Sequence, residues 1–208
     1  MQTYLKQVTP DSLAEAGAII RSGGLVAFPT ETVYGLGADA LNENAAAKIY
    51  EAKGRPSDNP LIAHIADMDM LEEVCTDIPE EAYMLADRFW PGPLTMILKK
   101  KDIVPNETTG GLDTVAVRMP DNPVALELIR QSGTPIAAPS ANTSVRPSPT
   151  TAQHVYGDLD GRIPMILDGG DVIIGIESTI IDLTSEIPAV LRPGYITPGD
   201  IEALIGSV

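Results

Sequence analysis

The chain has 208 residues, of which 44% are hydrophobic and 21% charged, and its formal net charge is −15. This length suits one α/β domain and is short for two, and the composition is unlike that of disordered or fibrous proteins. The acidic balance opposes non-specific nucleic-acid binding, which depends on neutralising phosphates. No stretch reaches the roughly 20 apolar residues of a membrane span. Residues 1–6 lack the basic-then-apolar run of a secretory signal. We therefore expect a cytoplasmic protein with no membrane partner.

Hydrophobic periodicity and turn residues divide the chain into alternating helices and strands. Helices are expected near residues 13–21, 44–52, 68–74, 79–89, 124–131 and 198–205, with a short one after a proline-rich loop. Strands are expected near residues 25–28, 61–66, 94–98, 114–118, 136–138, 165–167, 178–183 and 189–191. Because βαβ stretches alternate with a closing hairpin, the pattern predicts an α/β fold. We expect one domain over residues 1–208, a twisted mixed parallel and antiparallel sheet with helices packed on it.

Three local features refine this prediction. Asp11 or Ser12 is placed to cap the first helix. Residues 184–186 suit a hairpin between the last two strands. Residues 30–37 are neither helical nor alternating, and their two glycines permit close approach of the backbone to a ligand or to another strand.

The residue types needed for several common sites are scarce. The chain holds one cysteine, Cys75, and two histidines, His64 and His154. One cysteine forms no internal disulfide, and we expect Cys75 to be an inert structural thiol. No G-x-x-x-x-G-K-[ST] motif occurs, which excludes a P-loop, and no G-x-G-x-x-G follows a strand, which argues against a Rossmann cofactor site. The candidates for chemistry are therefore the polar loops at strand ends.

Basic residues are concentrated in these loops. Lys53 and Arg55 share one rigid turn with Asn59. Such a turn can wrap phosphates, or its cations can answer the dipole at a helix C-terminus. Arg118 ends an apolar strand, so its burial requires a carboxylate from the protein or from a ligand. Together with Arg146 and Arg192, these loop cations in an acidic protein indicate a local anion site.

Five polar motifs follow one another along the chain. They are Pro29-Thr30-Glu31-Thr32-Val33-Tyr34-Gly35-Leu36-Gly37, Lys53-x-Arg55, Ser140-x-Asn142, Ser178-Thr179 and Arg192-Pro193-Gly194. In isolation each suits a polar turn or a helix end as well as a binding loop. In this order they resemble the motifs of YrdC-type threonylcarbamoyl-AMP synthases, and the resemblance runs from residue 25 to the end. It implies a YrdC-like fold and the formation of threonylcarbamoyl-AMP and pyrophosphate from L-threonine, bicarbonate or CO2, and ATP, for tRNA threonylcarbamoyladenosine modification.

The resemblance also implies roles for individual residues. The catalytic tetrad would be Lys53, Arg55, Ser140 and Asn142. Threonine would be bound by Thr32, His64, Arg118, Ala138 and Ser178. ATP would be bound by Arg55, Asn59, Thr114, Ser140, Ser148 and Arg192. On its apolar strand His64 would otherwise be read as a core histidine. Mg²⁺ would accompany ATP, and the sequence identifies no protein ligand for the metal.

Two other functions stay open at this point. One is a non-catalytic module of the same fold that binds double-stranded RNA or tRNA, which the net charge of −15 disfavours. The other is a carbamoyl-adenylating domain like those of hydrogenase-maturation proteins, whose zinc-finger and acylphosphatase modules the sequence lacks. For a synthase we expect at most weak direct tRNA binding, with the product passed to a separate tRNA threonylcarbamoyl-transferase complex. Longer family members add a linker and a second domain, so we expect the linker's contribution to be missing here.

Overall fold

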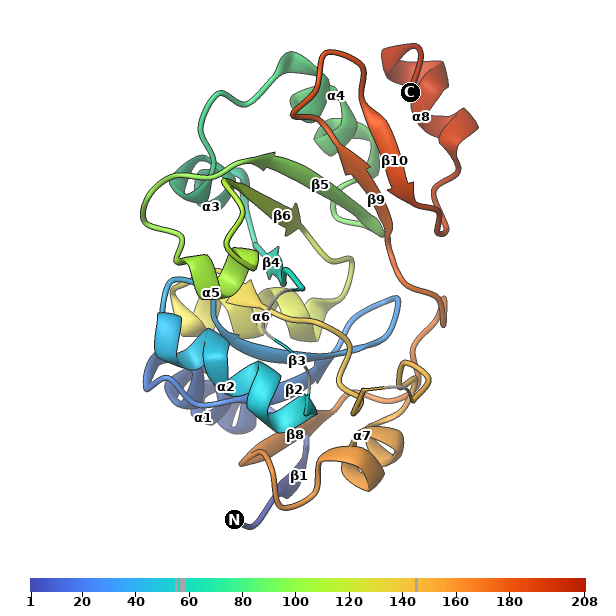
Figure 1. The fold of residues 1–208 in the computed structure, drawn as a ribbon. Coiled ribbons are helices and arrows are strands. Elements are labelled where there is room, and N and C mark those ends of the chain that lie inside the picture. Colours follow the sequence, from blue (N-terminus) through green and yellow to red (C-terminus); the bar gives the residue numbers. More distant parts are fainter. Residues whose placement is uncertain (55, 57–58, 145) are drawn as a thin grey trace.

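The computed structural model describes residues 1–54, 56, 59–144 and 146–208. Arg55, which we predict to contact ATP, lies outside these residues. Within them, ten strands form one sheet in the order β1-β8-β2-β3-β7-β4-β6-β5-β9-β10 (Figure 1). The strands are Tyr4–Gln7 (β1), Val26–Pro29 (β2), Tyr34–Asp39 (β3), Ile62–His64 (β4), Leu94–Lys99 (β5), Thr114–Arg118 (β6), Ile136–Ala137 (β7), Met165–Asp168 (β8), Thr179–Asp182 (β9) and Ala189–Arg192 (β10).

The sheet is mixed, as predicted. The pairs β1–β8, β2–β8, β4–β6 and β5–β9 are parallel, and the pairs β2–β3, β3–β7, β4–β7, β5–β6 and β9–β10 are antiparallel. The predicted closing hairpin is therefore confirmed in β9 and β10. The helices are Pro10–Arg21 (α1), Glu43–Lys53 (α2), Met68–Val74 (α3), Glu80–Phe89 (α4), Asn106–Thr109 (α5), Pro123–Ser132 (α6), Ala152–Leu159 (α7) and Pro198–Ile205 (α8).

The start of α1 differs from the prediction. Thr9 is the N-cap, because its hydroxyl accepts from the Ser12 N–H at 3.1 Å while the Ser12 hydroxyl accepts from the Thr9 N–H at 2.8 Å. The expectation that Asp11 or Ser12 caps the helix was wrong. The helix begins at Pro10, whose fixed φ suits the first helical position, and this places the cap one residue before it.

Strand β3 occupies the segment that the sequence left unassigned. A Cβ on Gly37 would lie 2.7 Å from Ile136 Cγ2 and 2.8 Å from Phe28 Cε1, so packing between neighbouring strands requires a glycine there. A glycine at this position interrupts the alternation of apolar and polar residues by which a strand is recognised in a sequence. Strand β1 and helix α5 were also missed, since both are four residues long and β1 is mostly exposed.

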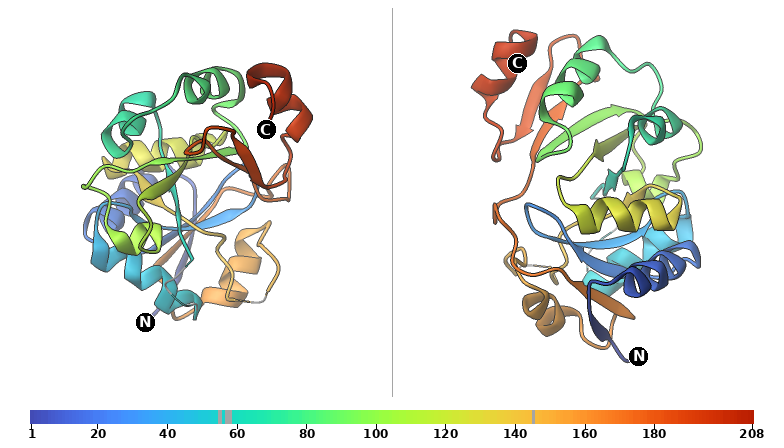
Figure 2. Two further views of the ribbon diagram at one scale, coloured as in Figure 1. Left: turned by 45° about the horizontal axis from the view of Figure 1, so that its top comes forward. Right: turned by 180° about the vertical axis from the view of Figure 1, so that it is seen from behind.

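Helices α1 and α6 lie side by side and cover β2 and β8 (Figure 2). Their contact residues are fully buried, including Ile20 on α1, Leu128 on α6 and Phe28 on β2. At the other end of the molecule, α8 packs beside α4, next to the β9–β10 hairpin (Figure 1). A long connection from β8 to β9 runs between these two regions. None of the helices in the described residues is long and apolar enough to cross a membrane.

Candidate active site

A cavity of about 350 Å³ lies over the middle of the sheet. Its walls come from the neighbouring strands β3, β4, β6, β5 and β9 and from the loop after β7. Eight of the residues predicted for the site line it: Thr32, Asn59, His64, Arg118, Ala138, Ser140, Ser178 and Arg192. The sheet thus brings together side chains that lie up to 160 positions apart in the sequence.

Arg118, at the end of β6, is held by three groups of the protein. Its Nε donates to the Gly92 carbonyl at 3.2 Å and its Nη1 to the Thr32 hydroxyl at 3.0 Å. Its Nη2 lies 2.6 Å from Glu31 Oε1, and the two side chains are only 4% and 6% exposed. Burial lowers the pKa of the Arg118 guanidinium, and the adjacent Glu31 carboxylate opposes that shift. The sequence left open whether a carboxylate of the protein or of a ligand would pair with Arg118. Glu31 provides one from the protein.

This ion pair is close, yet it is incompletely hydrogen-bonded. Neither Arg118 Nη2 nor either carboxylate oxygen of Glu31 has a hydrogen bond of good geometry to the described residues. A buried polar group without such a bond costs about 1–3 kcal/mol. Arg118 lines the cavity, so its wall contains a buried guanidinium, paired with Glu31, beside space that a ligand can enter.

His64 lies beside this pair, because β4 places it in register with Arg118 on β6. Its Nδ1 lies 3.1 Å from the Ile62 carbonyl oxygen, and its ring meets the edge of Phe28 at a centroid distance of 6.2 Å. Burial, and then the charge of Arg118, lower the pKa of His64 to about 3. The imidazole is therefore neutral at physiological pH and contributes hydrogen bonding without charge.

A second arginine, Arg192 at the end of β10, also lines the cavity. Its Nε donates to the Ser178 carbonyl at 3.0 Å and its Nη2 to the Ser178 hydroxyl at 3.2 Å. Its Nη1 lies 2.5 Å from Glu177 Oε2, and the other oxygen of that carboxylate accepts from the Ser148 hydroxyl at 3.1 Å. The Ser178 hydroxyl also shares a 2.7 Å hydrogen bond with Thr95. Two residues predicted for ATP are thus joined by one carboxylate.

Gly194 makes this approach of the two chain segments sterically feasible. A Cβ at Gly194 would lie 2.6 Å from both the Glu177 carbonyl oxygen and the Thr179 nitrogen. Contacts this short with backbone atoms are not relieved by a side-chain rotation. The glycine of the Arg192-Pro193-Gly194 motif is therefore needed for the loop to lie against residues 177–179.

Lys53 ends α2 and faces the loop that carries Ser140 and Asn142. Its ammonium donates to the carbonyl of Ser140 and to that of Asn142, the latter at 2.6 Å, and the residue is 3% exposed. Asn142 in turn donates to the carbonyls of Thr143 and Arg146. Ser140 is one of the described residues that line the cavity, whereas Lys53 and Asn142 are buried and are not among them. This geometry fixes the loop, and the catalytic role of the tetrad stays a prediction.

The other predicted residues are distributed around the cavity. Thr114 begins β6 opposite Lys99 on β5 and is not one of the described lining residues. Ser148 lines a second hollow of about 520 Å³, whose wall also includes Glu177 and Arg192. Arg146, predicted to join an anion site, instead forms an ion pair with Asp158 at 2.5 Å.

The chain matches a family model over residues 18–194, that of the Sua5–YciO–YrdC proteins, described as "Telomere recombination". The chain belongs to the Sua5–YciO–YrdC family. It is 61% identical over 193 residues to a threonylcarbamoyl-AMP synthase of Pyrococcus abyssi, covering 93% of this chain and 57% of that protein. It is 37% identical over 194 residues to a putative threonylcarbamoyl-AMP synthase of Mycobacterium tuberculosis, covering 93% of this chain and 89% of that protein.

The fold of this Sua5–YciO–YrdC protein also matches a solved structure. The crystal structure of P. abyssi Sua5 complexed with L-threonine superposes with a TM-score of 0.95 at 57% identity, covering all of this chain and 61% of that one. The predicted YrdC-like fold is confirmed. The chain spans little more than half the length of the Pyrococcus relative.

Sequence reasoning missed both carboxylates of the site. Glu31 and Glu177 were present in the segments that drew attention, one beside Thr32 and the other beside Ser178. Their position next to predicted threonine-site residues was the sequence signal that could have identified them. Glu31 pairs with Arg118 on β6, and Glu177 pairs with Arg192 on β10. These pairings depend on the arrangement of the strands in the sheet, which the motifs do not show.

Proposed function

We propose that this protein is an L-threonylcarbamoyladenylate synthase. It forms threonylcarbamoyl-AMP and pyrophosphate from L-threonine, bicarbonate or CO2, and ATP. Residues 1–208 act as one ATP- and threonine-binding domain in the cytoplasm, and the product passes to a separate tRNA threonylcarbamoyl-transferase complex. The observation that carries the proposal is the cavity itself, in which eight of the residues predicted for the site, the buried Arg118 among them, come together.

The threonine end of the cavity is built around Arg118. The α-carboxylate of threonine accepts charge-assisted hydrogen bonds from the guanidinium. Such bonds are stronger than those between neutral groups. Thr32 and Ser178 supply hydroxyls for the remaining polar groups, and Ala138 borders the site through its backbone. The neutral His64 adds a polar ring without a second positive charge.

The reaction needs no nucleophile from the protein. The threonine amine first forms a C–N bond to CO2, losing a proton, to give a carbamate. A carbamate oxygen then attacks the α-phosphorus of ATP, and the bond to the β-phosphate bridging oxygen breaks as pyrophosphate leaves. Asn59, Ser140, Ser148 and Arg192 hold the nucleotide in line with the carbamate, and positioning of this kind supplies much of the rate.

Mg²⁺ would reach the site with ATP. No group of three or more His, Cys, Asp or Glu side chains in the described part of the chain could hold a metal ion. Mg²⁺ commonly binds through substrate phosphates and water with one or two carboxylates. Glu177, the carboxylate among the described lining residues, is already paired with Arg192 and Ser148, so the ion would be held through the ATP phosphates. The metal would neutralise charge on the phosphates.

Pyrophosphate release tests this function directly. We expect release that requires threonine, bicarbonate and ATP together. Carbamoyl phosphate should not replace threonine and bicarbonate, since that requirement belongs to the hydrogenase-maturation type of carbamoyl-adenylating domain. Release with carbamoyl phosphate and ATP, in the absence of threonine, would favour that domain. ATP binding without any release would contradict synthase activity.

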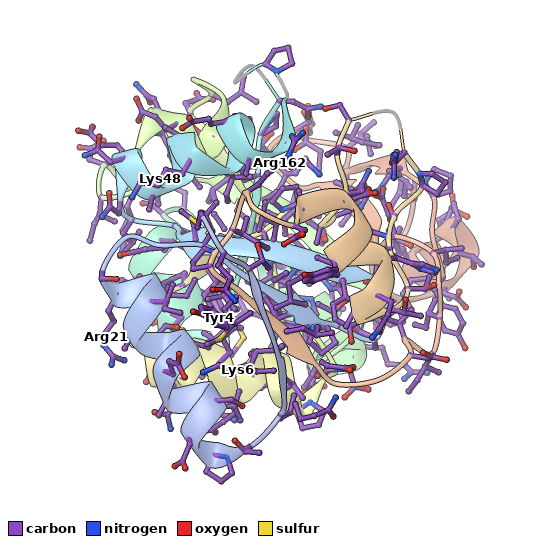
Figure 3. The ribbon with its side chains drawn as sticks, turned by 90° about the horizontal axis from the view of Figure 1, so that it is seen from below. Tyr4, Lys6, Arg21, Lys48 and Arg162 are labelled. Atoms are coloured by element: carbon purple, nitrogen blue, oxygen red, sulfur yellow. The ribbon has the colours of Figure 1, made fainter. Side chains whose placement is uncertain are left out.

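The RNA-binding alternative has one observation in its favour. Lys6, Arg21, Lys48 and Arg162 lie on the face seen from below in Figure 3, and none of them lines the cavity. Lys6 is already paired with Glu15 at 2.5 Å, while Lys48 donates to the Gly23 carbonyl. With a net charge of −15, this face supports at most weak contact with tRNA.

A further inference from the structure

The ion pair between Glu177 and Arg192 lies between two hollows. Both residues line the main cavity of about 350 Å³ and also the neighbouring hollow of about 520 Å³. The main cavity alone is near the lower limit for small-molecule sites, although two substrates must bind together. Any nucleotide whose phosphates extend from the cavity into the second hollow therefore meets this pair.

Glu177 occupies the groups on which phosphate binding depends. One carboxylate oxygen lies 2.5 Å from Arg192 Nη1, and the other accepts from Ser148 at 3.1 Å. The same guanidinium also holds Ser178 through two hydrogen bonds. A phosphate can replace the carboxylate on Arg192 and Ser148 because both anions accept the same hydrogen bonds.

Solvent exposure makes this replacement feasible at Arg192. The side chains of Arg192 and Glu177 are 34% and 41% exposed, so a displaced Glu177 carboxylate can be hydrated. The cavity's other pair, Arg118 and Glu31, is at most 6% exposed, and a displaced Glu31 would be left buried. The two pairs therefore differ in whether their carboxylate can leave.

We propose that Glu177 competes with the phosphates of ATP for Arg192 and Ser148, and so sets the affinity of the site for phosphate-bearing ligands. The proposal rests on the proposed function. A ligand with phosphates replaces one anion by another at Arg192, whereas a ligand without phosphates leaves the pair in place. Glu177 therefore gives up Arg192 when the phosphates bind, and after the reaction it pairs with Arg192 again as pyrophosphate leaves.

The test compares Glu177→Gln with a matched control, Glu15→Gln. Glu15 also forms an ion pair at 2.5 Å, with Lys6, and its side chain is 49% exposed, so both substitutions remove one charge and one exposed pair. ATP and pyrophosphate binding are measured by calorimetry at low and high salt, with Mg²⁺ and with chelator. We expect Glu177→Gln to bind both ligands about 2- to 5-fold more tightly, the range that an exposed ion pair contributes. Glu15→Gln should match the wild type, and the gain should shrink with salt.

Three outcomes would overturn the proposal. Unchanged ATP affinity in Glu177→Gln would mean that the carboxylate does not compete for Arg192. Weaker binding with and without Mg²⁺ would make Glu177 a support for Arg192, and weaker binding only with Mg²⁺ would make it a metal ligand. If the wild-type protein binds no ATP at all, the proposed function itself fails, which is a separate result.

Discussion

Removing the carboxylate of Glu31 should strongly destabilise the fold. Glu31→Ala leaves the Arg118 guanidinium buried without its counter-ion, and breaking a buried pair in this way costs about 3–5 kcal/mol. Arg118 would keep its hydrogen bonds to Gly92 and Thr32, which favours the lower end of that range. Arg118→Ala leaves a carboxylate with no hydrogen bond to the described residues, so we expect a cost near the upper end.

The double substitution separates charge pairing from simple loss of packing. Glu31→Ala combined with Arg118→Ala leaves a cavity but no buried charge, so its cost should be well below the sum of the single costs. We expect a coupling free energy near the upper end of the 0.5–3 kcal/mol that contacting residues show, or about 3 kcal/mol. Urea unfolding at pH 7, followed by far-UV circular dichroism, measures all four free energies of unfolding.

Additive costs would refute this reasoning. If the double substitution costs the sum of the singles within about 0.5 kcal/mol, the two side chains do not interact and Arg118 is not held by Glu31. A folded double variant should also have lost threonine-dependent pyrophosphate release while retaining ATP binding. Retained threonine dependence would remove Arg118 from the proposed threonine site.

Three further predictions follow from the same cavity. Lys53→Ala should lower the thermal unfolding midpoint, since each backbone carbonyl left without its donor costs about 1–3 kcal/mol; lost turnover with unchanged melting would instead indicate a direct role at the phosphates. With a folded-state pKa of about 3 against 6.5, His64 protonates first in the unfolded chain, so stability falls as pH drops from 6.5 toward 3 by about 1.4 kcal/mol per unit. His64→Phe should flatten this dependence between pH 6.5 and 5 in urea titrations, and a parallel curve would contradict the assignment. Labelled tRNA should bind with a Kd of about 10⁻⁴–10⁻⁶ M at physiological salt and be displaced by ATP; nanomolar binding unaffected by ATP would favour the RNA-binding module.

The elements that the sequence predicted best carry local signals. Helix α6 begins at Pro123 after the Asn122 cap and ends at Gly133, and strand β6 is a run of apolar residues ending at Arg118. Strand β3 could not be recognised, because Gly37 is required by contacts with Phe28 and Ile136. The strands of these two residues were predicted, but the sequence does not show that they flank residues 34–39. Local propensity predicts a helix or strand when residues within the segment determine it. It fails when contacts with residues distant in sequence determine the structure.

The candidate site shows the same division. The motifs and the family resemblance identified residues that the sheet does bring to one cavity, such as Thr32, His64 and Arg118. They gave no indication that Lys53 is buried against backbone carbonyls, since that contact joins the end of α2 to a loop almost 90 positions later. The burial of a side chain and its hydrogen-bond partners depend on the assembled fold. They distinguish a side chain that stabilises a loop from one that is placed to bind a ligand.

In the proposed site, the two arginines of the cavity carry the same charge but would meet substrate anions under different conditions. At Arg118, an arriving carboxylate adds to a pair that stays in place, because Glu31 has no solvent to move into. At Arg192, an arriving phosphate exchanges with Glu177, which water can receive. Arg192 also holds both the carbonyl and the hydroxyl of Ser178, a residue of the threonine end. We therefore expect a change of partner at Arg192 to alter the contacts of both the ATP site and the threonine site. The difference in burial between the two ion pairs makes Arg118–Glu31 fixed and Arg192–Glu177 exchangeable.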